Sequence, residues 1–176
     1  MISIIVARDV DGGVGKENDI PWMGLFPEDM RFFRQTTNNN TVIMGTNTWL
    51  SLPSTHRPLP NRTNIVVSSL QKEIHSKAHS VIIPCENKTI KEQIISLDKN
   101  STCDIYIIGG PTLWSSVLDI VDRIYITNIP NRYNCDVFFN PDLTIFKHTE
   151  TISLKDNHAL DVYVYERNHK QCYNIL

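Results

Sequence analysis

Short runs of apolar, mostly β-branched residues recur along the chain, with more polar segments between them. Runs of this kind are typical of β-strands. A weaker candidate, Lys147–Leu154, precedes the last clear run. The clear predicted strands are Ile2–Ala7, Thr41–Met44, Asn64–Val67, Ser80–Ile83, Asp104–Ile108, Arg123–Ile129 and Leu160–Glu166.

Segments with apolar residues at helical spacing lie between these strands. Pro27 suits the first position of a helix, and the acidic Glu28 and Asp29 suit the positive end of the helix dipole. A helix is therefore predicted to begin at Pro27. The other predicted helices span Thr46–Leu52, Thr89–Leu97 and Pro111–Val121.

Strands that alternate with helices indicate an α/β fold with a largely parallel sheet. The last two strands are joined only by the polar segment 155–158, which predicts a C-terminal antiparallel hairpin at the sheet edge. The 176 residues show no break in composition, so we expect a single domain over residues 1–176.

Charge and cysteine content exclude several classes of protein. Seventeen Lys and Arg against nineteen Asp and Glu give a net charge of −2, which disfavours a nucleic-acid-binding protein. We find neither a signal peptide nor an apolar run of about 18 residues, so we expect a cytoplasmic protein without a membrane span. The four cysteines (85, 103, 135 and 172) form no CxxC motif. Free thiols and no metal site are expected, two disulfides in a secreted chain being the alternative.

The seven glycines are unevenly placed. Four lie within residues 12–24, one is Gly45, and two form the pair Gly109-Gly110. Glycine permits positive φ and close approach of backbone to a ligand, so three distant segments are candidates for ligand contact. Ordinary turns are the alternative, and for Gly12-Gly13 they are the favoured interpretation.

Two of these glycine segments lie where a predicted strand passes into a helix. A helix start exposes unpaired N–H groups that bind anions such as a pyrophosphate. Neither Gly45-Thr46 nor Gly109-Gly110 fits the GxGxxG motif, however. A nucleotide site therefore remains one of two open interpretations.

Asp29 is the strongest candidate for acid–base chemistry. On a helix it shares a face with Phe32, Phe33 and Thr36, and an apolar face would raise its pKa. The alternative is an acid that only interacts with the helix dipole. Glu28 fits that alternative better, because it points about 100° away from Asp29.

A series of sequence blocks occurs in an order that is typical of one enzyme family and covers nearly the whole chain. The blocks are Ile2–Ala7, Gly15–Trp22, Asp29–Phe33, Val42–Gly45 with Thr48-Trp49, Arg57–Arg62, Ser68-Ser69, Ile108–Gly110 and Tyr125–Thr127. Together they closely resemble dihydrofolate reductase. The chain is too short to include a fused thymidylate synthase.

The resemblance implies a single-domain, eight-stranded, mainly parallel twisted sheet flanked by about four helices. It also implies reduction of 7,8-dihydrofolate to 5,6,7,8-tetrahydrofolate with NADPH, in support of one-carbon metabolism and of thymidylate and purine synthesis. Such enzymes are antifolate targets and are most often monomers. Dihydrofolate and NADPH are therefore the expected partners.

The resemblance assigns catalytic roles to three residues. Asp29 matches the acid that binds the pterin and promotes protonation of the ring nitrogen beside the hydride-accepting carbon, which makes that carbon electrophilic. Thr127 matches the hydroxyl that hydrogen-bonds this acid. Trp22 matches the residue that orders a nearby water.

The resemblance also assigns binding residues. Arg62 matches the cation that pairs with the glutamate α-carboxylate of the substrate, for which an Arg fork is well suited. Residues 15–20 match a mobile loop that closes over the nicotinamide, and Gly109-Gly110 matches a pair joined by a cis peptide. The remaining substrate contacts are Ile5, Ala7, Met30, Phe33, Leu52, Leu59 and Ile108. The cofactor contacts are Ala7, Val14, Gly15, Ile20, Gly45, Thr46, Asn47, Thr48, Ser68, Ser69, Gly109, Gly110, Thr112, Leu113 and Trp114.

Some positions depart from the family pattern. Thr46 and Thr112 stand where many members carry a basic residue, so NADPH is expected to be preferred over NADH less strongly, with Lys72 as a substitute cation. The segment from Trp22 to Asp29 is a residue or two longer than usual, and Cys135-Asp136 replaces a Gly-Asp pair.

Two other functions are open. A pyrimidine reductase of riboflavin synthesis shares the fold but has no reason for an acid placed as Asp29 is. A nucleotide-binding or structural protein could keep the fold without turnover, although Asp29, Trp22, Thr127 and Arg62 argue against it.

Overall fold

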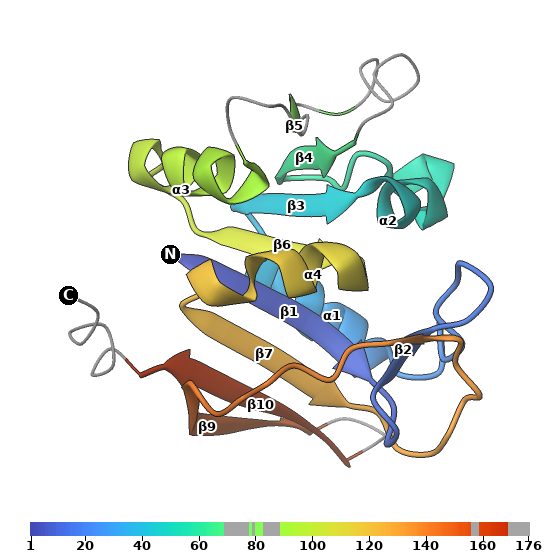
Figure 1. Ribbon diagram of the computed structural model, residues 1–176. Helices are drawn as coiled ribbons and strands as arrows, with labels where there is room; N and C mark the ends of the chain where they lie inside the picture. The colour runs from blue at the N-terminus through green and yellow to red at the C-terminus, as the bar shows by residue number, and fades with distance from the viewer. Residues whose placement is uncertain (69–77, 79, 83–88, 156–158, 169–176) are drawn as a thin grey trace.

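The computed structural model of the chain describes residues 1–68, 78, 80–82, 89–155 and 159–168. Within these ranges, one twisted eight-stranded sheet runs through the molecule in the order β5-β4-β3-β6-β1-β7-β10-β9 (Figure 1). Its strands are β1 (Ile2–Arg8), β3 (Thr41–Gly45), β4 (Thr63–Val67), β5 (Ser80–Ile82), β6 (Ile105–Gly109), β7 (Arg123–Asn128), β9 (Phe146–Lys155) and β10 (Ala159–Arg167).

The strand directions confirm a mainly parallel sheet. The pairs from β5 across to β7 are parallel, whereas β10 runs antiparallel to both β7 and β9. The predicted C-terminal hairpin is therefore present at the sheet edge. A separate two-stranded ladder joins β2 (Gly13–Gly15) to β8 (Val137–Phe138), both too short for the sequence pattern to predict.

The predicted helices are present, with small shifts at their ends. They are α1 (Pro27–Thr37), α2 (Thr46–Ser51), α3 (Ile90–Asn100) and α4 (Pro111–Val117), and a short 3-10 helix spans Ser54–His56. The prediction of one helix over Pro111–Val121 was wrong at its end. Val117 leaves the α region and a 3-10 turn, Leu118–Ile120, leads into the extended Val121. For the strand predicted over Ser80–Ile83, the last residue lies outside the described residues.

Local sequence explains where two helices begin. Pro27 occupies the first position of α1, with Glu28 and Asp29 in its first turn. Helix α3 starts with a reciprocal cap: the Glu92 amide donates to Thr89 Oγ1 (3.2 Å), and the Thr89 amide donates to Glu92 Oε2 (2.7 Å).

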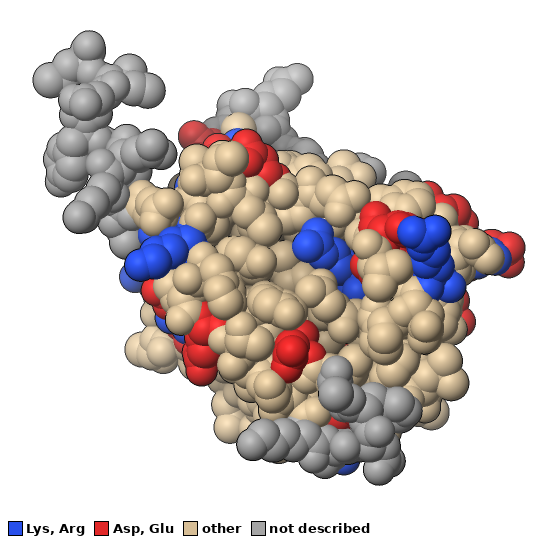
Figure 2. Space-filling model, turned by 90° about the horizontal axis from the view of Figure 1, so that it is seen from below, with Lys and Arg blue, Asp and Glu red and all other residues tan. Residues whose placement is uncertain are grey.

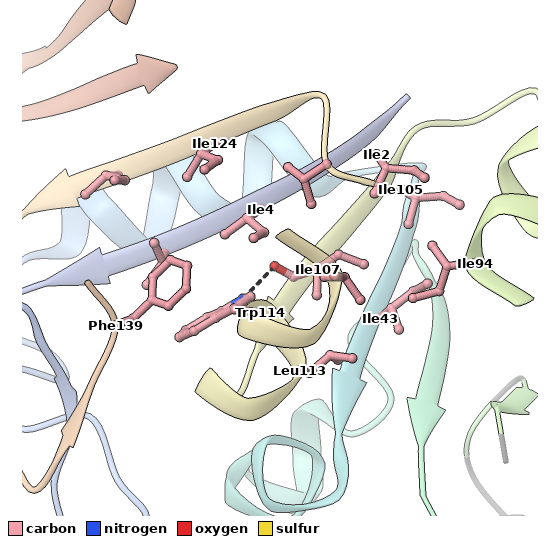
Figure 3. Close-up of a cluster of buried hydrophobic side chains, with 14 of the residues drawn as sticks. Ile2, Ile4, Ile43, Ile94, Ile105, Ile107, Leu113, Trp114, Ile124 and Phe139 are labelled. Atoms are coloured by element: carbon pink, nitrogen blue, oxygen red, sulfur yellow. Dashed lines mark hydrogen bonds between the residues drawn. The ribbon is translucent and has the colours of Figure 1, made fainter. Parts of the chain in front are cut away.

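The sheet separates two apolar layers. Alternate residues of β1 point to opposite faces, so Ile4 belongs to the layer with α3 and α4, and Ile5 to the layer with α1 and α2. In the first layer, Trp114 of α4 donates from Nε1 to the carbonyl oxygen of Ile107 at 3.0 Å (Figure 3). This bond fixes α4 over the sheet directly after β6.

The distribution of charge and the character of the helices bear on function. Seen from below, the described Lys and Arg side chains lie in small groups among acidic and uncharged ones (Figure 2). Within the described ranges, none of the helices is both long and apolar enough to cross a membrane.

Candidate active site

A cavity of about 970 Å³ opens at the carboxyl ends of β1, β3 and β6. Ligands of open α/β sheets bind at this edge because the loops and helix starts that follow parallel strands gather there. Gly15, Gly24, Gly45 and the pair Gly109-Gly110 line the cavity, as the uneven glycine distribution predicted. Gly12 and Gly13 do not line it; Gly12, with a φ of +83°, fits the turn interpretation, whereas Gly13 begins strand β2.

Helix α1 places Asp29 in the cavity wall. The carboxylate is half-buried and receives a hydrogen bond from the Thr127 hydroxyl, which β7 presents from the neighbouring sheet. Burial raises the pKa of Asp29 above its ordinary range; the Thr127 bond opposes this shift and the charge of Glu28 adds to it. The cavity therefore holds a carboxyl group that takes up a proton more readily than an exposed aspartate.

Glu28 precedes Asp29 on α1 but has a different environment. Only 3% of its surface is exposed, and it does not line the cavity. Its side chain is buried in the protein and does not face solvent. Its charge therefore acts on Asp29 from behind the cavity wall.

The apolar residues predicted to contact substrate all line this cavity. They come from β1, α1, β6 and the segment that follows α2, so residues distant in sequence form one wall. The lining residues from this prediction are Ile5, Ala7, Met30, Phe33, Leu52, Leu59 and Ile108. Such a wall suits a flat aromatic ring system.

Arg62 is held at the far end of helix α1. Its guanidinium donates from Nε to the carbonyl oxygen of Pro60 (2.8 Å) and from Nη1 to Thr37 Oγ1 (3.1 Å), and it stands 5.8 Å from the centre of the Phe33 ring. Both acceptors are uncharged, so these contacts orient the guanidinium without neutralising it. Burial lowers the pKa of Arg62 below its ordinary value, and the charge of Arg34 lowers it further. The group remains a cation, since arginine does not deprotonate in proteins.

Sequence reasoning missed Arg34 and His56, which also line the cavity. Arg34 follows Met30 by four residues on α1 and so shares its face, a signal that helical spacing could have supplied. Its charge lowers the pKa of Arg62, which places Arg34 close to that group. The cavity therefore has an acid near the start of α1 and two cations near its end.

Three glycines line the half of the cavity beside α2 and α4. A Cβ atom on Gly109, whose φ is +136°, would stand 2.9 Å from Thr48 Oγ1, and one on Gly45 would stand 3.7 Å from the Gly110 nitrogen. The peptide bond between Gly109 and Gly110 is cis, as the resemblance implied. The ends of β3 and β6 thus form a bare, narrow cradle that accepts a ligand close to the main chain.

Most residues predicted to contact the cofactor lie in this part of the cavity. The lining ones are Ala7, Val14, Gly15, Ile20, Gly45, Thr46, Asn47, Thr48, Gly109, Gly110, Thr112, Leu113 and Trp114. Ser68 is buried after β4 and does not line the cavity, whereas Ser69 and Lys72 lie outside the described residues. Thr46 donates from Oγ1 to the Val67 carbonyl oxygen at 3.4 Å, and neither α2 nor α4, both fully described, contains a Lys or Arg.

Trp22 forms the wall between the cavity and a small apolar cluster. Only 3% of its surface is exposed, and its ring meets that of Tyr133 edge-on, with 5.2 Å between the centres. Phe26, Ile129 and Leu160 complete this cluster. Trp22 is therefore packed in this cluster and also lines the cavity.

Comparisons with known proteins show the family of this chain. The family model described as dihydrofolate reductase matches residues 1–169. A dihydrofolate reductase of Ureaplasma parvum is 30% identical over 163 residues (93% of this chain, 96% of the relative), and one of Buchnera aphidicola is 35% identical over 156 residues (89% and 88%). The structure of dihydrofolate reductase from Enterococcus faecalis, complexed with NADP(H) and RAB-propyl, superimposes with a TM-score of 0.79 at 29% identity and covers 96% of each chain.

Proposed function

The chain belongs to the dihydrofolate reductase family, and we propose that Asp29, Thr127 and Trp22 carry the proton chemistry of its reaction. The reaction itself is the NADPH-dependent reduction of 7,8-dihydrofolate to 5,6,7,8-tetrahydrofolate. Its proposed metabolic role is the supply of tetrahydrofolate to one-carbon metabolism, and hence to thymidylate and purine synthesis.

One observation supports these assignments above all. The cavity pairs a half-buried carboxylate of raised pKa with a hydroxyl donor at one end, and it has two arginines at the other. Dihydrofolate has matching chemistry, with a polar pterin edge at one end and a glutamate carboxylate at the other. The apolar wall between them suits the pterin and aminobenzoyl rings.

Asp29 acts on the pterin in this proposal. Its carboxylate binds the amidine edge of the ring, and the Thr127 hydroxyl holds the carboxylate in the orientation that this contact needs. A negative charge there favours protonation of the ring nitrogen, which makes the adjacent carbon a better hydride acceptor. Because burial raises the pKa of Asp29, its carboxyl group takes up a proton more readily than that of an exposed aspartate. Trp22 orders the water through which a proton reaches the ring.

NADPH, when bound, supplies the hydride. The glycine cradle formed by Gly45, Gly109 and Gly110 has room for the part of NADPH that lies against the main chain. Asn47 and Thr48 line the same region of the cavity. Ala7, Val14 and Ile20 exclude water where the nicotinamide lies, which protects the transfer. Thr46 and Thr112 have no charge to offer the 2′-phosphate, so selection against NADH is proposed to be weaker than in members with arginine there.

Arg62 is proposed to hold the substrate's glutamate α-carboxylate. Its guanidinium is already oriented by Pro60 and Thr37, so little rotamer freedom is lost on binding. Arg34 adds positive charge at the same end of the cavity.

We also propose that residues 1–176 form one domain that acts as a cytoplasmic monomer without a nucleic-acid partner. The sheet that runs through the described ranges supports one domain. Cys103 and Cys135 are free thiols, which are typical of a reducing compartment. The net charge of −2 gives no general attraction to phosphate backbones.

The test is spectrophotometric. The absorbance of NADPH at about 340 nm should fall with dihydrofolate present and stay constant without it. The Asp29→Asn variant should bind NADPH normally and oxidise it slowly. Wild-type protein that binds both ligands without turnover would contradict the proposed roles and favour a binding protein that has kept the fold.

A further inference from the structure

A buried carboxylate outside the cavity collects hydrogen bonds from two loops. Asp9 follows β1 directly and is only 3% exposed. Its Oδ1 accepts from the amides of Asp11 (2.9 Å) and Gly13 (2.8 Å), and its Oδ2 accepts from the amide of Tyr133 (3.1 Å) and the thiol of Cys135 (3.7 Å). The pKa of Asp9 lies below its ordinary range, because these donors outweigh the effect of burial. The group is thus an anion on which two chain segments converge.

The first of these segments leads into the cavity. Gly13 begins β2, and the next two residues, Val14 and Gly15, line the cavity where the cofactor is proposed to bind. The loop is pressed against its partner segment: a Cβ on Gly13 would stand 2.5 Å from Cys135 Cβ and 3.0 Å from Asp9 Oδ1. The position of Val14 therefore depends on how this junction is held.

The second segment leads to Trp22. The residue whose amide donates to Asp9 Oδ2 is Tyr133, and the ring of this residue packs edge-on against Trp22 at 5.2 Å. The carboxylate fixes the backbone of Tyr133, and the ring of Tyr133 then fixes the indole. One anion is therefore connected to both halves of the cavity, through Val14 on one side and Trp22 on the other.

We propose that Asp9 is a positioning residue for hydride transfer, because it holds the β1–β2 loop and Tyr133 in the arrangement that places Val14, Gly15 and Trp22 around the reacting rings. The inference rests on the proposed function, which assigns these three residues to the site. Asp9 does not line the cavity and acts only through them.

The decisive variant is Asp9→Asn, which keeps the size of the side chain. One carboxylate oxygen becomes an NH₂ group that faces an N–H donor instead of accepting from it, so one of the two loops is released. Asp142→Asn is the matched control, because Asp142 accepts one backbone amide, that of Thr144 (2.9 Å), in an exposed turn away from the cavity.

Two binding probes separate positioning from a general loss of structure. NADPH reaches the loop through its nicotinamide, whereas adenosine 2′,5′-bisphosphate has no nicotinamide. We expect Asp9→Asn to slow single-turnover hydride transfer about tenfold and to weaken NADPH binding about fivefold, while bisphosphate binding changes less than about twofold. Asp142→Asn should match wild type in all three measurements.

Several outcomes would overturn the proposal. Unchanged hydride transfer in Asp9→Asn would do so, and so would equal weakening of NADPH and of the bisphosphate. If Asp9→Asn does not fold, Tyr133→Leu decides, because it keeps the amide bond to Asp9 and removes the ring from Trp22. We then expect hydride transfer to slow about threefold or more with the bisphosphate affinity unchanged, and no slowing refutes the connection through Trp22. Failure of wild-type protein to reduce dihydrofolate would instead contradict the proposed function.

Discussion

Replacing Asp29 by Asn tests the proposed chemistry and the electrostatics of the cavity together. The amide keeps the size of the side chain and still accepts from the Thr127 hydroxyl, but it has neither the negative charge nor the exchangeable carboxyl proton. We expect hydride transfer to slow at least about tenfold near pH 7, which corresponds to about 1.4 kcal/mol or more in the activation free energy. The loss should shrink at low pH, where the substrate arrives already protonated.

The Asp29→Asn variant should be more stable than wild type at pH 7, although it is less active. Because burial raises the pKa of Asp29 in the folded protein, the folded state binds a proton more tightly than the unfolded chain, whose Asp has a pKa of about 3.9. The free energy of unfolding therefore falls as the pH rises through the interval between these two pKa values, by up to about 1.4 kcal/mol for each unit that separates them, less what solvent in the open cavity screens. Asp29→Asn has no such loss, so it should be more stable than wild type at pH 7, with the difference disappearing below about pH 4.

Two assays decide the matter. Stopped-flow measurement of hydride transfer from preformed ternary complexes, between about pH 5 and 9, gives the chemical step without product release. Urea unfolding of both proteins at about pH 4 and 7 gives the stability difference. Full activity of the Asn variant at pH 7 would refute the assignment. A variant less stable than wild type at pH 7 would refute the electrostatic argument.

Three further predictions concern binding and the core. Arg62→Leu should weaken dihydrofolate binding by about 2–5 kcal/mol, the cost of leaving a buried charge unpaired, with little effect on a pterin that lacks the glutamate; equal losses by titration would mean that Arg62 serves the fold. Thr46→Arg should widen the kcat/KM preference for NADPH over NADH and make NADPH binding more salt-sensitive; a wild-type preference of about a thousandfold or more would contradict the reasoning. Ser3→Ala should increase the free energy of unfolding by about 1 kcal/mol and so raise the urea midpoint, because the buried Ser3 Oγ has no hydrogen-bond partner among the described residues. A lower midpoint would show that the hydroxyl has a hydrogen-bond partner.

Periodicity and spacing predicted the parts of the molecule that depend on neighbours in sequence. The strand and helix pattern gave the order of elements, and the helical face shared by Asp29 and Phe33 gave the carboxylate that the structure places in the cavity wall. Burial of Glu28 was not predictable in the same way, because it depends on what the folded chain packs around α1, such as β9.

Long-range contacts explain the other omissions. Asp9 resembles any turn aspartate in the sequence, and its role becomes visible only when the amide of Tyr133, 124 residues away, reaches its carboxylate. The β2–β8 ladder joins Gly13 to Phe138 through so few residues that no alternating pattern can form in either strand. Ser68, assigned to the cofactor by resemblance, is buried and does not line the cavity. A pair of adjacent serines in the sequence does not indicate which way either side chain points.

The two halves of the cavity differ in how freely they can mutate, and this bears on drug resistance. Contacts beside Met30 and Leu52 are made by flexible apolar side chains, which can exchange for others of similar volume at little cost. At Gly109 even one added carbon would meet Thr48 Oγ1 at 2.9 Å, in a backbone conformation that other residues rarely adopt. Resistance to an antifolate that touches only the apolar wall therefore has many single-substitution routes. An inhibitor that extends an arm onto the glycine cradle would leave the protein few of them.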